Sequence, residues 1–441
     1  MADRPNILMM TCHDIGQHLG CYGVESVHTP NLDRLAGEGV RFERSFASAP
    51  TCSPSRASIF TGRWPHQTGV LGLCHGGYAW DMNRDEIHLA RYLADAGYHT
   101  EDLGIMHEAH TIEGRGFDYL RLFDEHWRPS CDELVDVFAE RLDVRAGGER
   151  PWFTHIGFFE PHSPFDHGGA TPDDSMGVSV PPWLVDEPSA QEVFAAYQGP
   201  IRKVDAAIGR VLDKLQAAGL AENTLVLYTA DHGIPFPRAK ASLYDPGLTV
   251  PLLIRWPARG WAGGKVLDPM VSNIDHVPTL LDTLGLDLPD RVEGRSYRPL
   301  LDGEEYTPHD AVFCEHTYHG GGMFIDPRRA VRTERYKLIA NFSTNRPWVD
   351  RPGLRFVEAV SADDVNQLGM GRFPNIELYD LAADPLETTN LADDARHQQV
   401  STQLRSRLLN WMRSKADPLL EGFPTPPTYD RTMAALREAA D

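Results

Sequence analysis

The sequence predicts an α/β fold, with a large, mixed and mostly parallel sheet flanked by helices and a smaller C-terminal subdomain that combines an antiparallel sheet with a helix. Short apolar runs alternate with amphipathic segments as far as about residue 328, and several of these runs end in polar residues. Beyond that point, short strand-like runs lie closer together and one helical pattern follows them. We therefore divide the chain into an α/β domain, residues 1–328, and a C-terminal α+β subdomain, residues 329–441.

The individual elements follow from apolar periodicity and from turn residues. Strands of the larger sheet are expected at residues 6–10, 98–104, 151–158, 224–229, 250–254 and 311–313. Helices are expected at residues 29–36, 86–96, 131–145 and 193–218. Residues 163–190 are rich in Pro, Gly and Asp, which indicates a surface excursion. In the subdomain we expect strands at residues 330–333, 336–339 and 377–380 and a helix at 398–415.

Composition narrows the class of protein. The 441 residues, of which 41% are hydrophobic and 24% charged, are typical of a globular chain with a large core. A formal net charge of -21 argues against a general nucleic-acid or anionic-membrane binder, because long-range repulsion would oppose association. No secretory signal, membrane-spanning run or paired-cysteine framework is apparent. We therefore expect a cytoplasmic location, no nucleic-acid or membrane partner, and leave open whether the chain forms an oligomer.

The stretch from residue 49 to residue 62 has an uncommon spacing. Cys52 lies in a turn-forming segment, Arg56 follows four residues later, and a helix-compatible run to Phe60 ends at Thr61-Gly62. A helix that begins just after the cysteine would direct backbone N–H groups and the positive end of its dipole at the sulfur. Such a setting lowers a thiol pKa and suits an anionic substrate. The alternative is a buried cysteine ahead of an ordinary helix.

Other polar residues follow predicted strands, at the edge where open α/β sheets bind ligands. They are His13 and Asp14, Asp231 and His232, and then His107, His162 and Lys240. Each alone is explained by a turn or a cap, and only their joint occurrence favours a functional site. Asp and His side chains with an oxygen nucleophile can hold a divalent cation, and histidines can move protons near neutral pH. A lysine and an arginine complete an anion pocket.

Taken together, these motifs resemble the type I sulfatases of the alkaline phosphatase superfamily. The resemblance extends over nearly the full length of the chain and is greatest to the N-sulfoglucosamine sulfohydrolases (heparan N-sulfatases). Its landmarks are Pro5-Asn6-Ile7-Leu8, Thr29-Pro30-Asn31-Leu32-Asp33, Cys52-Ser53-Pro54-Ser55-Arg56, Glu160-Pro161-His162, Asp231-His232-Gly233-Ile234-Pro235-Phe236-Pro237, and Leu243-Tyr244-Asp245-Pro246-Gly247. The resemblance implies the alkaline phosphatase-like fold described above.

The resemblance also implies a role for each matching residue. A formylglycine-generating enzyme would convert Cys52 to formylglycine (3-oxoalanine), whose hydrate attacks sulfur and forms a covalent sulfate ester. Arg56 would hold the hydrate, and His107 would help to break down the ester by taking a proton from it. His162 and Lys240 would bind sulfate and assist the leaving group. The metal ligands implied are His13, Asp14, the modified Cys52, Asp231 and His232, with Ca²⁺ as the family's metal.

Three positions depart from the family pattern. His13-Asp14 stands where Asp-Asp is usual, Asp231-His232 where Asp-Asn is usual, and Ile105 where the pocket has a lysine. Imidazole in place of oxygen ligands moves metal preference from Ca²⁺ toward Mn²⁺ or another transition metal. The Asp-His pair is also similar to that of the phosphonate monoester hydrolases of the same superfamily, which carry the same modified cysteine.

The leading hypothesis is a sulfatase that hydrolyses a sulfate ester or a sulfamate on a small sulfated saccharide. The alternative is a phosphonate or phosphate ester hydrolase on the same scaffold, and a non-catalytic protein that keeps the fold is the least favoured. Four further residues are weaker candidates for lining the substrate cleft, with a solvated loop as the alternative for them: His75, Trp80, Asp81 and Glu108.

Overall fold

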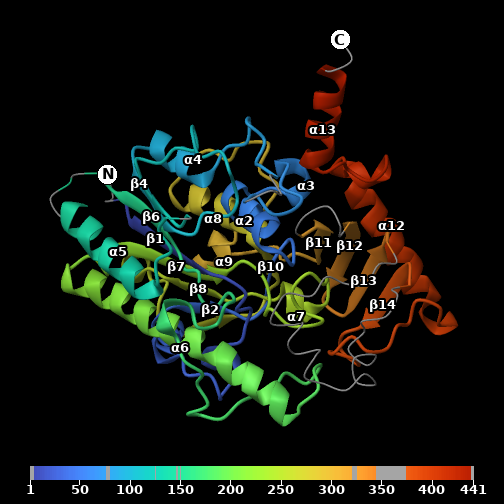
Figure 1. The fold of residues 1–441 in the computed structure, drawn as a ribbon, viewed down its shortest axis with the longest axis horizontal. Helices are drawn as coiled ribbons and strands as arrows, with labels where there is room; N and C mark the ends of the chain where they lie inside the picture. Colours follow the sequence, from blue (N-terminus) through green and yellow to red (C-terminus); the bar gives the residue numbers. More distant parts are fainter. Residues whose placement is uncertain are drawn as a thin grey trace.

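Two large β-sheets of unequal size organise the protein (Figure 1), and residues 45–46 and 271–272 pair as a third, two-stranded sheet. The computed structural model describes residues 4–75, 80–124, 126–145, 148, 150–319, 325–343 and 374–438. The larger sheet has eight strands and the smaller has four, in agreement with the predicted α/β domain and antiparallel subdomain. Within the described ranges, no helix combines the length and the apolar character that crossing a membrane requires.

The larger sheet is mixed and mostly parallel, as predicted. Its order is β5-β4-β6-β1-β7-β8-β2-β9, and β8 runs antiparallel to both of its neighbours. The strands are β1 (Asn6–Cys12), β2 (Val40–Phe42), β4 (His99–Gly104), β5 (Tyr119–Leu122), β6 (Trp152–Gly157), β7 (Thr224–Ala230), β8 (Leu252–Arg255) and β9 (Lys265–Leu267). Sequence patterns had not indicated β5, whose side chains are partly or fully exposed.

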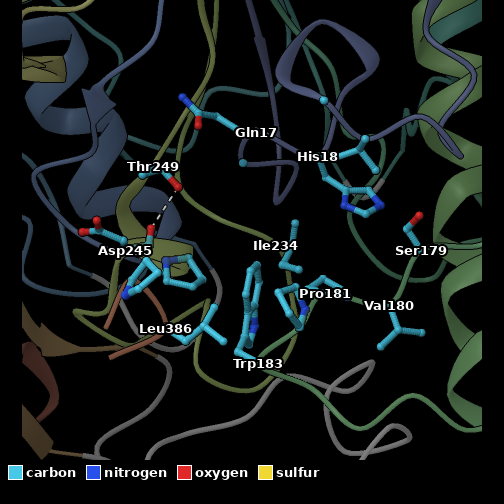
Figure 2. Close-up of a pocket in the computed structure, with 16 residues that line it drawn as sticks. Gln17, His18, Ser179, Val180, Pro181, Trp183, Ile234, Asp245, Thr249 and Leu386 are labelled. Carbon is cyan, nitrogen blue, oxygen red and sulfur yellow. Dashed lines mark hydrogen bonds between the residues drawn. The ribbon is translucent and has the colours of Figure 1, made fainter. Parts of the chain in front are cut away.

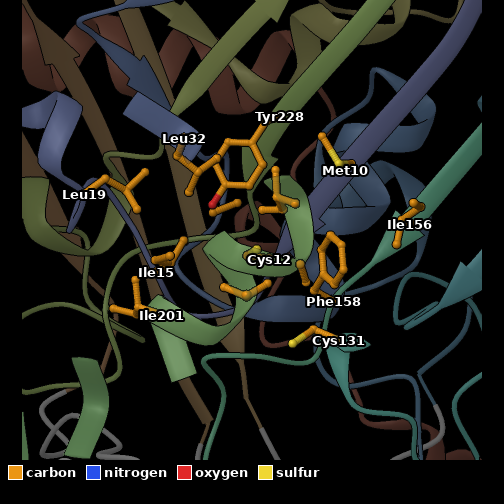
Figure 3. Close-up of a cluster of buried hydrophobic side chains, with 14 of the residues drawn as sticks. Met10, Cys12, Ile15, Leu19, Leu32, Cys131, Ile156, Phe158, Ile201 and Tyr228 are labelled. Carbon is orange, nitrogen blue, oxygen red and sulfur yellow. The ribbon is translucent and has the colours of Figure 1, made fainter. Parts of the chain in front are cut away.

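Helices cover both faces of this sheet, so strands β6 and β7 are buried throughout. Side chains alternate along β1, and Leu8 and Met10 enter one core while Ile7 and Met9 enter the other. The first core, shown in Figure 3, lies under the helices α1 (Pro30–Glu38), α5 (Cys131–Arg145) and α6 (Pro188–Ala217). The second lies under α2 (Cys52–Thr61), α4 (Leu89–Asp95) and α8 (His276–Thr283).

The smaller sheet is antiparallel and has the order β11-β12-β13-β14. Its strands are β11 (Ala311–Tyr318), β12 (Ile325–Thr333), β13 (Tyr336–Asn341) and β14 (Ile376–Asp380), and α12 (Gln398–Ser414) packs against it. The run at 311–313 thus pairs with the second sheet rather than the first. Strand β12 extends across residue 328. The division of the chain into two domains at residue 328 stays a prediction.

The remaining elements are short, apart from the last helix. They are β3 (Ser45–Phe46), β10 (Val271–Ser272), α3 (Pro65–Thr68), α7 (Asp245–Leu248), α9 (Arg298–Asp302) and α13 (Pro427–Glu438). Short 3₁₀ helices lie at Gly20–Tyr22, His167–Gly169, Pro257–Arg259, Asn273–Asp275, Ala395–His397 and Pro418–Leu420. The excursion predicted at 163–190 ends where α6 begins, several residues earlier than the periodicity had placed that helix.

A buried ion pair joins His66 on α3 to Glu315 on β11. His66 Nδ1 lies 2.5 Å from Glu315 Oε2, and His66 Nε2 lies 3.0 Å from the Lys415 carbonyl oxygen. Both neighbours are acceptors, so only the doubly protonated imidazole can donate to both. Burial lowers the pKa of His66, but the charges of Glu315 and Asp417 outweigh it and raise the pKa above its ordinary value.

We therefore expect His66 to make stability depend on pH. A raised pKa in the folded state gives a stabilisation that is complete below the ordinary pKa of about 6.5 and is lost as pH rises through the raised value. Replacing His66 with Gln should cost about 1–3 kcal/mol at low pH, because a charged hydrogen bond is lost, and less at high pH. Thermal unfolding of both proteins between about pH 6 and pH 9 measures this; a difference in Tm that does not change with pH would contradict it.

Candidate active site

The predicted site assembles where β1, β7 and α2 meet. Because β1 and β7 are adjacent parallel strands, the residues that follow them, Asp14 and Asp231, lie together. The Asp14 backbone N–H donates to Asp231 Oδ1 at 3.0 Å. Ligand atoms of His13, Asp14, Cys52 and Asp231 all lie within 4.8 Å of one another, and all four residues are buried. The structure thus brings together four of the five predicted metal ligands.

Cys52 is the first residue of α2. The residue before it, Thr51, has extended backbone angles, and the helix ends at Gly62, whose φ of 68° is the left-handed conformation that glycine adopts readily. The helix therefore includes the cysteine, one residue earlier than the sequence had indicated. Cys52 is only 2% exposed, and its Sγ lies 3.3 Å from His232 Nε2.

Arg56 lies one helical turn after Cys52, on the same face of α2. Its guanidinium is fully buried and donates from Nε to Asp231 Oδ2 at 3.2 Å and from Nη1 to Thr11 Oγ1 at 2.9 Å. A third, longer bond of 3.4 Å runs from Nη2 to the carbonyl oxygen of Cys12. These bonds fix the plane of the guanidinium beside the start of the helix.

Three cationic or potentially cationic groups surround the carboxylate of Asp14. Lys240 Nζ lies 2.7 Å from Oδ2, His232 Nε2 lies 3.1 Å from Oδ1, and His162 Nε2 lies 3.8 Å from Oδ2. Burial alone would raise the pKa of Asp14, but Lys240, His162 and His232 outweigh burial and hold the pKa well below its ordinary value. Asp14 is therefore a charged carboxylate in the protein interior.

The backbone of Asp14 is held in an uncommon conformation. Its φ is 49°, in the left-handed region that costs a non-glycine residue free energy. The Tyr197 hydroxyl on α6 donates to the Asp14 carbonyl oxygen at 2.5 Å, and this bond helps to keep the carboxylate turned toward Asp231.

Asp231 is charged for similar reasons. Burial opposes its charge, but His232, His13 and Arg56 outweigh burial and hold the pKa well below the ordinary value. Its Oδ2 lies 2.9 Å from His13 Nδ1. Burial, together with the charge of Arg56, lowers the pKa of His13 to about 3, so this imidazole is neutral near pH 7.

His232 completes the charged cluster. Its Nδ1 lies 2.9 Å from the Gly233 carbonyl oxygen, so Nδ1 carries a proton and Nε2 points to Asp14 and Cys52. Burial lowers the pKa of His232, but Asp231, Cys52 and Asp14 outweigh it and raise the pKa well above its ordinary value. Gly233 is required here because a Cβ would lie 1.8 Å from the Pro246 carbonyl oxygen.

These donors fit a divalent cation. Among the described residues, His13 Nε2 is buried and has no hydrogen-bond partner, although such groups are normally satisfied. Two charged carboxylates and a neutral imidazole within ligand distance of one another would satisfy this atom by coordination. His232 Nε2 approaches the same group through its contacts with Asp14 and Cys52.

The other predicted catalytic histidines line the approach to this cluster. The His107 ring is perpendicular to His13 with a centroid distance of 5.2 Å, and His75 stacks on His107 at 4.3 Å. His162 contacts His13 with a centroid distance of 5.4 Å. Burial, with His13 and His75 as the next causes, lowers the pKa of His107 well below its ordinary value, so His107 is a neutral base.

The weaker substrate candidates have different surroundings. His75 contacts the site through its stack on His107. Asp81 accepts hydrogen bonds from the backbone N–H groups of His110 and Thr111 at 2.8 and 3.1 Å, an arrangement that organises a loop. Trp80 and Glu108 are buried rather than solvated: Trp80 packs on Tyr318, and Glu108 accepts from the backbone N–H of His107 at 2.9 Å. Contact of these residues with a substrate stays a prediction.

Sequence patterns did not indicate four buried polar residues near the site, namely Thr11, Asp102, His155 and Tyr197. Thr11 and His155 lie in largely apolar strands and Tyr197 in the long helix α6, whereas Asp102 lies in the polar run His99–Asp102. For Thr11 and His155 the one available signal was a polar side chain within a largely apolar run.

A separate cavity of about 370 Å³ lies beside the segments that follow Asp14 and His232 (Figure 2). Its walls include Pro181, Trp183 and Ile234. None of the predicted catalytic or metal-binding residues lines it, so the charged cluster, and not this cavity, is the candidate active site.

Comparison with known proteins places these residues in a family context. Residues 5–286 match a family model described as Sulfatase, and residues 236–349 match one described as N-sulphoglucosamine sulphohydrolase, C-terminal. The human N-sulphoglucosamine sulphohydrolase is 30% identical, and the alignment covers 94% of this chain and 91% of the human protein.

Two solved structures share the fold. The phosphonate monoester hydrolase of Agrobacterium radiobacter superposes with a TM-score of 0.73 at 23% identity, covering 93% of this chain and 96% of that one. A protein determined in complex with its substrate D-glucosamine-2-N,6-O-disulfate superposes with a TM-score of 0.73 at 21% identity, covering 94% and 99%. At these identities the two likenesses establish the fold only.

We predict that the Tyr197 hydroxyl supports cation binding. Replacing Tyr197 with Phe removes the bond to the Asp14 carbonyl, and loss of such outer contacts typically costs about 10–100-fold in metal affinity. Titration of the metal-depleted protein with Mn²⁺ and with Ca²⁺ measures this. Replacing Tyr98 with Phe is the matched control, because the Tyr98 hydroxyl also donates to a backbone carbonyl, that of Pro5, away from the site. Equal affinities for all three proteins would contradict the prediction.

Proposed function

Because the chain belongs to the sulfatase family, we propose that it hydrolyses a sulfate ester or a sulfamate on a sugar at the Cys52 cluster. The observation that carries the proposal is the position of Cys52 at the start of α2, where its ligand atom lies within 4.8 Å of those of Asp14 and Asp231. Conversion of Cys52 to formylglycine by a formylglycine-generating enzyme would supply an aldehyde hydrate. The hydrate is an oxygen nucleophile, whereas the unmodified thiol is a sulfur nucleophile.

The protein's own residues would bind and orient the sulfate group. Arg56 is buried and permanently charged, so it holds the group at position 52 by charge-assisted hydrogen bonds. Lys240 and His162 lie beside Asp14 and face the same space, where they would contact sulfate oxygens and the leaving group. His107 is neutral and can therefore accept a proton at a ring nitrogen. Arg56 and Lys240 are buried, which excludes water from them and strengthens their electrostatic interactions.

A divalent cation would be held by His13, Asp14, Asp231 and His232 together with the oxygen at position 52. When bound, it would supply positive charge that stabilises the nucleophile and a sulfate oxygen. Resemblance to the family implies Ca²⁺, but the two imidazoles favour Mn²⁺ or another transition metal over Ca²⁺.

The substrate class is a sulfated amino sugar. Identity of 30% to the human N-sulphoglucosamine sulphohydrolase and the C-terminal family match support an N-sulfated glucosamine derivative. The net charge of -21 disfavours binding of a nucleic acid. A cytoplasmic location stays a prediction; there, the available substrates would be small saccharides rather than polymers. In this proposal residues 1–328 carry the catalytic groups.

A phosphonate or phosphate ester is the second candidate substrate class. His232 favours it, because the Asp-His pair at 231–232 is similar to that of phosphonate monoester hydrolases, and the imidazole lies 3.1 Å from Asp14 Oδ1. Both reactions would use the same nucleophile and the same cation. They differ in the geometry and charge of the group transferred.

A substrate panel separates the candidates. We expect turnover of N-sulfoglucosamine or 4-nitrophenyl sulfate to exceed that of phenylphosphonate, and replacement of Cys52 with Ala to reduce each rate by at least about 10³-fold, as loss of a nucleophile does. Each rate should be measured with Mn²⁺ and with Ca²⁺. Faster turnover of phenylphosphonate would favour the second candidate, and a Cys52→Ala protein that keeps most of its activity would overturn the mechanism.

A further inference from the structure

A chain of buried polar side chains runs away from Arg56 into the apolar core. Arg56 Nη1 donates to Thr11 Oγ1 at 2.9 Å, Thr11 Oγ1 lies 2.9 Å from His155 Nε2, and His155 Nδ1 lies 2.9 Å from Asp102 Oδ1. All four residues are 0% exposed.

Strand pairing explains why these residues meet. Asp102 on β4 is directly opposite His155 on β6, and His155 is opposite Met9 on β1. Thr11 is two residues after Met9, so it points to the same face of the sheet. Helix α2 covers that face and places Arg56 at the end of the row.

The row formed by Thr11, His155 and Asp102 has apolar surroundings, so burying its polar groups costs free energy. The His155 ring contacts Phe60 edge-on at a centroid distance of 4.8 Å, and Met9 and Phe153 belong to the same core. Burying a polar group costs free energy unless its hydrogen bonds are made, and among the described residues Asp102 Oδ2 is buried with no hydrogen-bond partner. Packing alone therefore does not explain why these polar residues are buried here.

The direction of the hydrogen bonds points to Arg56. An arginine can only donate, and an ionised carboxylate can only accept. With Asp102 ionised and the ring proton of His155 on Nδ1, each link donates in turn: from Arg56 to Thr11, from the Thr11 hydroxyl to His155 Nε2, and from His155 Nδ1 to Asp102. Thr11 is thereby held as an acceptor for the guanidinium, and the bond to Asp102 favours a proton on His155 Nδ1.

The hydrogen bonds of Arg56 also leave some of its N–H donors available for the group at position 52. Of the five N–H donors of a guanidinium, three are used by the described residues, namely by Asp231, Thr11 and the Cys12 carbonyl. The other two donors are one N–H on each terminal nitrogen. Since the Thr11 bond fixes the rotation of the group, it decides where these two donors point.

We propose that Thr11, His155 and Asp102 are positioning residues that orient the Arg56 guanidinium toward residue 52. None of them touches the substrate, and each acts through the next. The inference rests on the proposed function, because it assigns to the row the task of aligning the group that holds the nucleophile. Its effect therefore falls on the chemical step and not on substrate binding.

A pair of substitutions at Thr11 tests the proposal on the full-length enzyme. Thr11→Val keeps the shape and removes the hydroxyl, and we expect kcat to fall about 10–100-fold with KM changed less than about 3-fold. Thr11→Ser restores the hydroxyl and should return kcat to within about 3-fold of the wild type. Thr100→Val is the matched control, because it removes another buried threonine hydroxyl from β4, one that donates to Gly116.

A double substitution tests whether the residues act as one unit. If they do, Thr11→Val combined with Asp102→Asn lowers kcat no further than the stronger single substitution. A Thr11→Val enzyme with unchanged kcat, equal losses in Thr11→Val and Thr100→Val, or fully additive losses in the double variant would each overturn the proposal.

A crystal structure of the Thr11→Val protein separates failure of this inference from failure of the proposed function. If the wild-type protein hydrolyses no sulfate, sulfamate or phosphonate, the proposed function fails, and the orientation of Arg56 still decides the inference. A guanidinium that rotates away from residue 52 supports the positioning role. A guanidinium that keeps its place overturns it.

Discussion

The structure of the site depends on two buried carboxylates, Asp14 and Asp231, that remain charged in the protein interior. An uncompensated buried charge costs several kcal/mol, so the two acids persist only because cations and hydrogen-bond donors surround them. Lys240 and His232 neutralise Asp14, while Arg56 and His232 neutralise Asp231. The same cations that stabilise the carboxylates also make the space beside residue 52 suitable for an anion.

The fold supplies the rigidity that this arrangement needs. Strand β1 lies between β6 and β7 with helices on both faces, so the segment that begins at His13 has little freedom to move. Tyr197 from one layer of helices fixes the backbone of Asp14, and Arg56 from the other layer fixes Asp231. The site is thus built from both faces of a single sheet, and its polar contacts continue inward through Thr11.

Sequence reasoning succeeded where geometry follows from local rules. The ends of adjacent parallel strands converge, so Asp14 and Asp231 could be placed together, and the four-residue spacing of Cys52 and Arg56 marked the segment that the structure shows as one face of α2. The inward row could not be predicted, because the pairing of Asp102 with His155 depends on strand order and register. The contacts of Glu108 could not be predicted for a related reason, since they involve the backbone N–H of His107 and the side chain of His88, whose placement depends on the fold.

Mass spectrometry of the peptide that contains Cys52, purified from the native host and combined with metal analysis of the same protein, tests the central claim most directly. We predict formylglycine at position 52 and at least about one divalent metal ion per chain, bound at the cluster of His13, Asp14, residue 52 and Asp231. An unmodified thiol at position 52 would contradict the claim that this cluster works as a sulfatase centre.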